Sequence, residues 1–498
     1  MSRLLDGWAP PILVGVVAFV AARLAMLPGV GFWDTGELQT VAPLLGTAHP
    51  TGYPTFVILG WLANSVLAPF GEPALRMNLF AGLCVAVGAA VTVDLARALT
   101  RSAVLGVAAG LGLALTPIVW RVGTQAEAHA LHLALTAILF RLLVAWEDGR
   151  RDRTLIAAAV VFGLALGNHS LTLLLALPIG LYVVAVEPDV VRRPGLIAGS
   201  MVALLVTVVL VFLELPLRAG PLRGPDTLVY GHPETWDGFW YVALAEQFRG
   251  SLIDPFGDAP EKVAALVGRM IAAFGVLTPL IPIGFGATIV MRPRYALLSG
   301  SAALITVFFA ASYFNADIER YYVVPALLAW TWLAQLAAGA ALLVGRNLGV
   351  RRGPEPVMAT LLAVALLVPT VTEVQVRYRS VDRSHDISAS VWVDRSLERM
   401  APNAVILSWW SYSTPLWYAQ LVQDRRPDIR IIDDRTRLDE SLGEITHVID
   451  AYLPSRPVYV IRIEPIEIAQ LEQRYSLVYL DGFSATGLTQ VLSREPAP

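Results

Sequence analysis

Long apolar runs recur over the first three quarters of the chain, and they limit its fold more than any other feature. A helix that crosses a bilayer needs about 20 mainly apolar residues. Eleven stretches meet or approach that requirement: residues 11–26, 77–99, 103–120, 131–146, 155–166, 171–186, 196–215, 263–290, 295–313, 322–343 and 357–371. We therefore expect an α-helical polytopic membrane protein with about eleven spans, in which residues 1–376 form the transmembrane domain.

Composition supports this expectation and excludes several classes of protein. Only 15% of the 498 residues are charged, whereas soluble proteins have about 25%. The formal net charge of −3 provides no strongly basic surface, so we expect no nucleic-acid partner. Cys84 is the only cysteine, which excludes a disulfide within the chain. No A-x-A-like cleavage site follows the first apolar run, so we expect that run to be a retained span.

The arginines predict which loops share a side, because cytoplasmic loops collect Lys and Arg. The run 55–70 is short and contains Asn64, so we interpret it as a surface or re-entrant helix. Every second loop is then basic, and the basic side holds Arg3, Arg97, Arg101, Arg150, Arg151, Arg153, Arg192, Arg193, Arg292, Arg294, Arg346, Arg351 and Arg352. This alternation predicts an integral plasma (inner) membrane protein with a cytoplasmic N-terminus and outer loops at 31–76 and 216–262.

The outer loop 31–76 carries the most concentrated group of chemically useful side chains. Asp34 and Glu37 lie three residues apart beside Trp33, and His49 and Tyr53 follow in a stretch rich in Pro and Gly. One interpretation is an ordinary polar loop in which Asp34 caps a helix at residues 35–37. The other is a catalytic loop at the membrane surface, in which a carboxylate is the general base.

Further polar groups, most of them ionisable, fall on the same outer face. They comprise Arg121, Gln125, Glu127, His129, Asn168, His169, Arg218, Glu234, Asp317, Glu319 and Arg320, with His132 and His232 in or near outer segments. Such groups are costly beside a membrane, so they are usually paired or functional. The loop 216–262 also holds several Trp, Tyr and Phe residues, which suit an interfacial aromatic belt or contact with a sugar or lipid headgroup.

From about residue 377 the composition changes. Strand-like runs at 404–409, 429–432, 457–463 and 476–480 alternate with helix-like runs at 387–400, 416–423, 440–451 and 466–473. This alternation predicts a small α/β domain over residues 377–498, and an odd number of spans places it outside. The chain has no GxGxxG and no Walker sequence, which argues against an ATP-driven transporter.

An outer carboxylate without a nucleotide-binding motif indicates a lipid-linked substrate. Transfer of a sugar from a lipid phosphate needs a base for the acceptor proton, donors for the phosphate leaving group and an apolar groove for the polyprenyl tail. Asp34 or Glu37 could be the base. Arg121, Arg218 or Arg320 could hold the phosphate, and the helical bundle would supply the groove.

Several motifs resemble one family of multi-spanning membrane proteins, whose eukaryotic branch includes a protein O-mannosyltransferase and which is similar to the GT-C glycosyltransferases. The motifs are FWDTGE (32–37), HPTGYP (49–54), YGHPET (230–235), PLWY (415–418) and RPD (426–428). The resemblance implies that Asp34 is the base and Glu37 its neighbour, and that the donor is a polyprenyl-phosphate sugar. Mannose is one candidate sugar, and the acceptor is a protein or another exoplasmic molecule. The stretch FGEPALR (70–76) also resembles GT-C lipid-A aminoarabinose transferases. The third motif departs from the family, which commonly has Trp and Asp where this chain has Tyr230 and His232.

We therefore expect Asp34 and Glu37 to be catalytic and a wider set to bind substrate. That set is Trp33, His49, Tyr53, Glu127, His129, His169, Arg218, His232, Glu234 and Arg320. The pattern requires no cofactor, although a divalent metal could be held by Asp34, Glu37, His49, Glu127 and His129. Glu127 and His129 are two residues apart, so on a regular helix they would not share a face.

Two other functions are compatible with the same residues. A transporter or flippase for a polar or lipid-linked solute could use the outer groups as an entry site, and a membrane-anchored binding protein could act through residues 377–498. In the glycosyltransferase interpretation we expect that domain to help receive the acceptor without holding the base. We expect Asp433, Asp434 and Arg435 to form a solvated loop. The remaining aromatics, Trp409, Trp410, Trp417 and Tyr418, would divide between the domain's own core and a surface that faces the catalytic loop.

Overall fold

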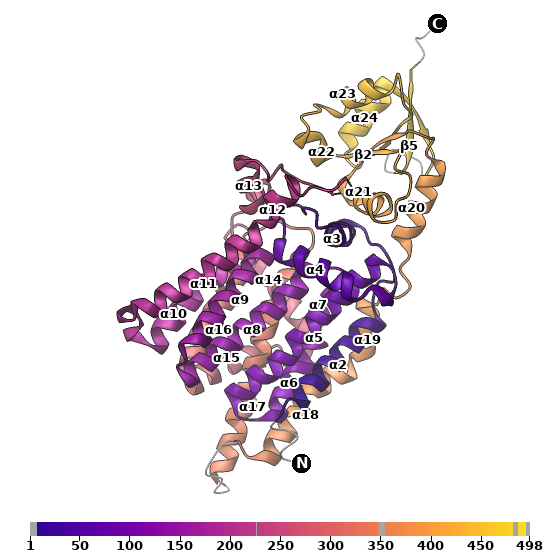
Figure 1. The fold of residues 1–498 in the computed structure, drawn as a ribbon. Coiled ribbons are helices and arrows are strands. Elements are labelled where there is room, and N and C mark those ends of the chain that lie inside the picture. Colours follow the sequence, from indigo (N-terminus) through magenta and orange to yellow (C-terminus); the bar gives the residue numbers. More distant parts are fainter. Residues whose placement is uncertain (1–6, 226, 348–353, 482–486, 495–498) are drawn as a thin grey trace.

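The chain forms a long helical bundle with a small sheet-containing domain at one end (Figure 1). The computed structural model describes residues 7–225, 227–347, 354–481 and 487–494. The bundle is built from α2 (Ala9–Leu24), α5 (Pro73–Thr100), α6 (Ala103–Ala114), α7 (Pro117–Val122), α8 (Ala128–Gly149), α9 (Asp152–Asn168), α10 (Ala176–Val186), α11 (Pro194–Phe212), α12 (Glu214–Ala219), α14 (Ala259–Phe274), α15 (Leu280–Met291), α16 (Pro293–Ala311), α17 (Val323–Asn347), α18 (Pro356–Thr372) and α19 (Val374–Val381).

Fewer helices meet the length and hydropathy expected of a membrane span than the sequence predicted. Among the described residues, five helices are long and apolar enough to cross a membrane, or seven if each of two bent pairs is one span. Within the described part of the chain, four shorter apolar helices also occur, namely α2, Pro54–Val66, α6 and the segment containing α10. The expected count of eleven is therefore not confirmed.

Two of the predicted spans are broken helices. The stretch 263–290 contains α14 and α15, which meet at a bend of 78°. Gly275 takes a positive φ of 54° there, which suits glycine and ends an α-helix. The stretch 103–120 is divided into α6 and α7 just before Pro117, because proline disfavours helical backbone in the residue that precedes it. Apolar composition alone did not reveal either break.

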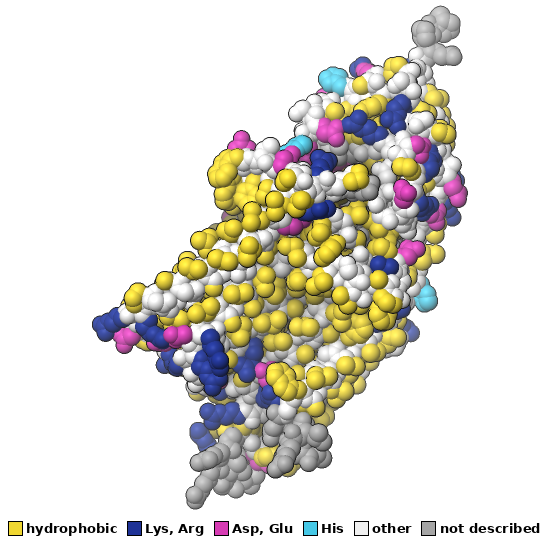
Figure 2. Space-filling model, viewed as in Figure 1, with side chains coloured by type: hydrophobic (Ala, Val, Ile, Leu, Met, Phe, Trp, Pro, Cys, Tyr) yellow, Lys and Arg dark blue, Asp and Glu magenta, His cyan; other side chains and the backbone are white. Residues whose placement is uncertain are grey.

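The bundle packs closely through small residues. The central helix α5 contacts α2, α6 and α8, and α15 contacts α17. Gly112 of α6 faces the buried ring of Trp330, whose atoms lie 2.3–2.5 Å from the position of an added Cβ. Small residues allow helices in membranes to approach in this way. Large apolar side chains such as Leu205 and Leu210 are exposed along α11, and hydrophobic side chains cover the visible side of the bundle (Figure 2).

Basic residues collect at the end of the bundle away from the sheet domain (Figure 2). Arg97 and Arg141 both pair with Asp94, and Arg292 donates to the carbonyl oxygens of Ala98 and Leu99 at 3.1 Å. Two arginines that the alternation assigned to one side, Arg97 and Arg292, thus lie at the same end of the bundle. The side of the membrane on which they lie stays a prediction.

The opposite end of the bundle carries α3 (Trp33–Leu44) and α4 (Pro54–Val66), followed by the short η1 (Ala68–Phe70). The helix α4 contacts α3, α5 and α9. The loop after α12 adds α13 (Trp236–Ala243) and η4 (Glu246–Ser251), and η6 (Ile318–Tyr322) precedes α17. These segments surround the place where the bundle meets the sheet domain.

The C-terminal domain contains one five-stranded sheet with the order β2-β1-β3-β5-β4. Its strands are β1 (Val405–Ser408), β2 (Arg430–Asp433), β3 (Val458–Ile461), β4 (Tyr475–Tyr479) and β5 (Thr489–Ser493), and its helices are α20 (Ser388–Arg399), α21 (Trp410–Trp417), α22 (Asp434–Asp439), α23 (Ile445–Tyr452) and α24 (Pro465–Arg474). β1 is parallel to β2 and β3, while β5 is antiparallel to β3 and β4. The expected α/β architecture is confirmed, although the sequence did not indicate β5.

Candidate active site

The motif predicted to be catalytic lies in the first turn of α3. Trp33 begins the helix with a positive φ of 59°, and Phe32 is its N-cap without any side-chain capping bond. Asp34 is therefore inside the helix, which excludes the interpretation that its carboxylate caps residues 35–37. A buried hydrogen-bond network holds the preceding loop: Gln39 accepts from Gly31 N at 2.9 Å and donates to Asn78 of α5 at 2.8 Å.

Asp34 forms an ion pair with Arg320 of η6. Its Oδ2 lies 2.5 Å from Nη1 of Arg320, and the same nitrogen lies 3.3 Å from Oε2 of Glu127. Burial of Asp34 is the largest single influence and favours its neutral form, but the charge of Arg320, the charge of His49, the hydrogen bond from Arg320 and the charge of Arg435 together outweigh burial. The pKa of Asp34 is therefore held below its usual range, and the carboxyl group is ionised at neutral pH.

Glu37 has a different task from Asp34. It is completely buried, its Oε2 bonds Nδ1 of His49, and its Oε1 accepts from the backbone N of His49 at 2.9 Å. The other ring nitrogen, Nε2, lies 3.0 Å from the hydroxyl of Tyr53, and burial raises the pKa of Tyr53. Both carboxylate oxygens of Glu37 are thus engaged, so Glu37 orients His49.

Glu127 and His129 form the next part of the site. Glu127 is the N-cap of α8 with extended backbone, and its Oε1 lies 3.2 Å from His129 N and 2.8 Å from His129 Nδ1. The expectation that these side chains would not meet was wrong, because Glu127 precedes the helix. The ring of His129 lies 4.6 Å from that of His169 and 5.2 Å from that of Tyr321.

The space between the carboxylates of Asp34 and Glu127 is taken by the guanidinium of Arg320. Among the residues that the structure describes, no three His, Cys, Asp or Glu side chains form a group that could hold a metal ion. Arg320 supplies the positive charge between these two carboxylates.

Three of the predicted binding residues lie elsewhere. Arg218 donates to the carbonyl oxygens of Leu44 and Leu45 at 2.9 and 2.8 Å, so it binds the C-terminal end of α3, where cations are favourable. His232 pairs with Glu234 at 2.9 Å on a partly exposed loop. A role in substrate binding stays a prediction for these residues, while Trp33, His49, Tyr53, Glu127, His129, His169 and Arg320 gather around Asp34 and Glu37.

The C-terminal domain contributes side chains that the sequence reasoning assigned differently. Trp410 lies with its ring 6.2 Å from that of Trp33 and 5.6 Å from that of His49, and its Nε1 donates to the hydroxyl of Tyr230 at 3.1 Å. Arg435 stacks on Trp410, with its guanidinium carbon 4.6 Å from the ring centroid.

The predicted solvated loop at 433–435 was therefore wrong. Asp433 is buried and caps α22, Asp434 pairs with Arg462 at 3.0 Å, and Arg435 faces the site. Three of the four aromatics contact residues outside the C-terminal domain: Trp410 as described above, Trp417, whose ring contacts that of Tyr230, and Tyr418, which accepts a hydrogen bond from Ala74 N at 3.0 Å. Two tryptophans directly after a strand were the available signal.

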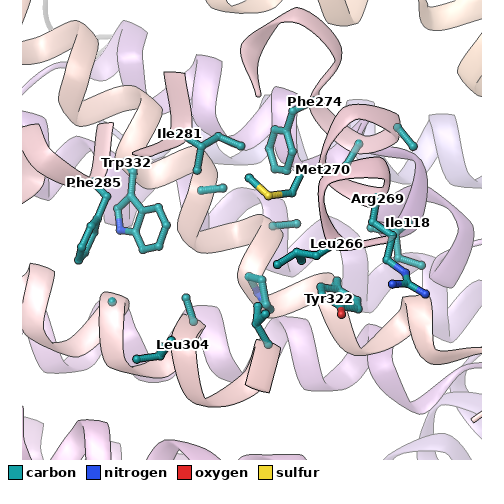
Figure 3. A pocket seen from close by; sticks show the side chains of 18 of the residues that line it. Ile118, Leu266, Arg269, Met270, Phe274, Ile281, Phe285, Leu304, Tyr322 and Trp332 are labelled. Atoms are coloured by element: carbon teal, nitrogen blue, oxygen red, sulfur yellow. The ribbon is translucent and has the colours of Figure 1, made fainter. Parts of the chain in front are cut away.

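A large apolar cavity lies beside the site, among α7, α14, α15, α16 and α17 (Figure 3). Its volume is about 930 Å³. Most of its lining is apolar, including Met270, Phe274 and Ile281, while Arg121, Arg269, Glu319 and Tyr322 provide polar groups.

The cavity and the carboxylate cluster share one short segment. Glu319 and Tyr322 of η6 line the cavity, whereas Arg320 between them pairs with Asp34. Arg121 of the cavity wall is held by Asp317, just before η6, at 2.5 Å. The site therefore continues into an apolar chamber whose polar residues include two arginines.

Comparisons with known proteins confirm the resemblance that the motifs indicated. Residues 34–191 match the family model for the N-terminal domain of protein O-mannosyl-transferase TMEM260. The mouse protein O-mannosyl-transferase TMEM260 is 34% identical over 189 residues, which make up 36% of this chain and 25% of that protein. The chain thus spans about a quarter of the length of this relative.

Solved structures match over nearly the whole length. ArnT from Cupriavidus metallidurans bound to undecaprenyl phosphate has a TM-score of 0.62 and 16% identity, with 96% of this chain and 97% of that chain covered. The apo state of the same protein has a TM-score of 0.58 and 14% identity, with the same coverage. At this level of identity the match establishes the fold, which is the GT-C fold of ArnT.

Proposed function

We propose that the chain is an integral-membrane GT-C glycosyltransferase that transfers a sugar, in the first instance mannose, from a polyprenyl phosphate to a hydroxyl group of a protein acceptor. The observation that carries this proposal is the ion pair of Asp34 with Arg320 at 2.5 Å. It keeps a carboxylate ionised where an apolar cavity meets the boundary between the two domains. A transporter would need ionisable groups along a path through the membrane, whereas the site residues of this chain gather at one end of the bundle.

The donor would occupy the cavity beside the site. A volume of about 930 Å³ with mainly apolar walls suits part of a polyprenyl tail. Arg121 and Arg269 would pair with the phosphate, since guanidinium groups bind phosphate oxygens through charge-assisted hydrogen bonds. The match to ArnT bound to undecaprenyl phosphate supports a donor of this class.

The reaction requires the transfer of one proton and the exchange of one bond. The acceptor oxygen would form a bond to C1 of the sugar while its proton passes to Asp34. The bond between C1 and the phosphate oxygen breaks, and its electron pair stays on the phosphate. Arg121 and Arg320 would stabilise the negative charge that develops there. Glu37 would hold His49 in a fixed orientation on the acceptor side of the pocket.

The orientation in the membrane is part of the proposal. The N-terminus would be cytoplasmic in the plasma (inner) membrane, and α3, α4 and the C-terminal domain would lie outside. The collection of arginines at the far end of the bundle supports this orientation. About eleven crossings would result if α2, α6, α9 and α10 also span, with α14 and α15 as one bent crossing.

Substitution of Asp34 by Asn tests the proposed base. The change keeps the size of the side chain and removes the proton acceptor, so we expect transfer to fall by about 10²–10⁴-fold while the protein remains folded. The assay is transfer of mannose from a polyprenyl phosphate to a Ser/Thr-containing peptide by the purified full-length protein.

Glu37→Gln is the matched control. Its side chain keeps one acceptor for the backbone N of His49, so we expect a smaller loss than for Asp34→Asn. If Asp34→Asn transfers sugar like the parent while Glu37→Gln is inactive, the role of the base has been assigned to the wrong carboxylate.

A further inference from the structure

The C-terminal domain brings one cation, Arg435, to the edge of the site and holds it there firmly. Its guanidinium carbon lies 4.6 Å from the ring centroid of Trp410 and 5.6 Å from that of Tyr230. With its amide oxygen turned toward the guanidinium, Gln247 accepts from Nε and Nη2 at 3.3 and 3.1 Å. Tyr230 and Gln247 belong to the loop between α12 and α14, so Arg435 is clamped across the boundary between the domains.

One donor of this clamped guanidinium is unused. Nη1 of Arg435 is buried and has no hydrogen-bond partner within the part of the chain that the structure describes. Leaving a donor of a charged group unpaired away from water costs free energy. Such a group is explained when a ligand supplies the missing acceptor.

Arg435 and the cavity reach Asp34 through different neighbours. Trp410, on which Arg435 stacks, contacts Trp33 and His49, and Trp33 directly precedes Asp34. Arg320 links Asp34 to η6, whose residues Glu319 and Tyr322 line the cavity. Asp34 is thus connected to both groups by separate contacts.

Trp33 adds a second sign that this flank receives a ligand. Its side chain is 54% exposed although it directly precedes the base. Its backbone φ of 59° is rare for a bulky residue and indicates local strain. An exposed aromatic ring held in a strained conformation beside the base offers an apolar face to a substrate.

We propose that Arg435 is an acceptor-binding residue: Nη1 donates a hydrogen bond to a main-chain carbonyl oxygen of the acceptor polypeptide, next to the hydroxyl that Asp34 deprotonates. Trp33 and Trp410 supply the rings against which that segment packs. This inference rests on the proposed function and identifies where its acceptor is bound. The acceptor site is thus made by both domains, and the C-terminal domain takes part in recognition directly.

Kinetics of Arg435→Gln and Arg435→Lys in the full-length protein test the inference. We expect the KM for a Ser/Thr-containing peptide to rise by about 10–100-fold in Arg435→Gln, the effect of losing a hydrogen bond from a charged group. The KM for polyprenyl-phosphate mannose and the slow hydrolysis of that donor by water should stay within about twofold of the parent. Arg435→Lys should give an intermediate KM, because it keeps the charge and loses the planar donor.

Two controls separate binding from a structural effect. Tyr230→Phe removes the hydrogen bond from Trp410 while it keeps the ring under Arg435, so it tests docking of the domain alone. Arg437→Lys changes an arginine two residues away that pairs with Asp434 at 3.6 Å. We expect the peptide KM of both controls to stay within about twofold of the parent.

Direct binding of a fluorescent peptide distinguishes this inference from the proposed function. Weaker peptide binding by Arg435→Gln, with donor hydrolysis unchanged, supports the inference even where transfer is too slow to follow. An equal loss of donor hydrolysis and transfer overturns it, as does an unchanged peptide affinity. A dependence on Arg435 that appears with a glycan acceptor and not with a peptide also overturns it. A parent protein that binds the peptide and transfers no sugar contradicts the proposed function instead.

Discussion

At the scale of single residues, the charge on Arg320 determines the state of the base. Asp34 lies in a largely buried position, where burial alone would favour its protonated form. Arg320 reverses that preference, so the pKa of Asp34 falls below its usual range. The same guanidinium also lies 3.3 Å from Oε2 of Glu127, so one arginine contacts two carboxylates.

Removal of that charge should change the pH dependence of transfer. A general base is active when ionised, so kcat/KM for the acceptor falls as the pH drops through the pKa of Asp34 in the free enzyme. In the parent this acid limb lies below the ordinary value of about 3.9. In Arg320→Gln burial acts without the opposing charge, so we expect the limb to move to higher pH. Measurement of kcat/KM from pH 4 to pH 8 checks this shift.

Arg320→Lys provides the control for the pH profile. It retains the positive charge near Asp34, so its acid limb should stay near that of the parent even if the rate is lower. Identical acid limbs in Arg320→Gln and the parent would show that Asp34 is not the group whose ionisation limits the rate.

The sequence indicated which residues belong to this cluster, but not what each of them contacts. Asp34, Glu37, His49 and Glu127 could be grouped because they fall on one face of a predicted topology. Glu37 binds His49 through both of its oxygens, and Glu127 caps α8. Both contacts depend on backbone geometry, which residue spacing does not reveal. Arg435 was missed because charge runs are commonly solvated, and only the fold brings Arg435 of α22 onto Trp410 of α21, which packs against α3.

At the scale of elements, the position of α3 depends on a close approach to α21. A Cβ added at Gly36 would lie 2.3 Å from the carbonyl oxygen of Gly31 and 2.9 Å from Oγ1 of Thr414. The first of these neighbours is backbone, which cannot turn aside as a side chain can. Gly36 therefore lets the catalytic helix pack between its own loop and the C-terminal domain.

Gly36→Ala should displace the first turn of α3. Small shifts of reacting groups are expensive, and about 1 Å of misplacement can cost about 10²-fold in rate. We expect transfer to fall by at least about 10-fold while the protein still purifies as a folded monodisperse species. Gly286→Ala in α15 is the control, because no atom lies within 4 Å of its added Cβ. Equal activities of the two variants would mean that the contact of α3 with α21 does not position the base.

The helices and strands also show which features the hydrophobic pattern predicts and which it does not. Runs of hydrophobic residues correctly indicated helices throughout the bundle, and alternation indicated most strands of the C-terminal sheet. The pattern did not reveal that 263–290 is two helices, since the bend at Gly275 depends on one glycine inside an apolar run. The bend has a consequence for function, because α14 and α15 form two walls of the cavity.

At the scale of the whole molecule, the group of arginines at the end of the bundle opposite the site, which includes Arg97 and Arg292, predicts the orientation in the membrane. Single cysteines at Glu72 and at Arg151, in a background where Cys84 is replaced, can be labelled with an impermeant maleimide in intact cells. We expect labelling at position 72, near α3, and none at position 151, beyond α8. Labelling at position 151 alone would reverse the orientation and place the base inside, and a variant without introduced cysteine gives the background.

The short segment η6 determines when the base can work. Arg320 forms an ion pair with Asp34. Its neighbours Glu319 and Tyr322 line the cavity proposed for the donor. Arrival of a phosphate there would draw the guanidinium toward it and release Asp34. If an acceptor or a water molecule bound first, the carboxylate of Asp34 would still be paired with Arg320. The proposed function therefore predicts an ordered reaction in which the donor binds before the acceptor, so that little of the activated sugar is lost to water.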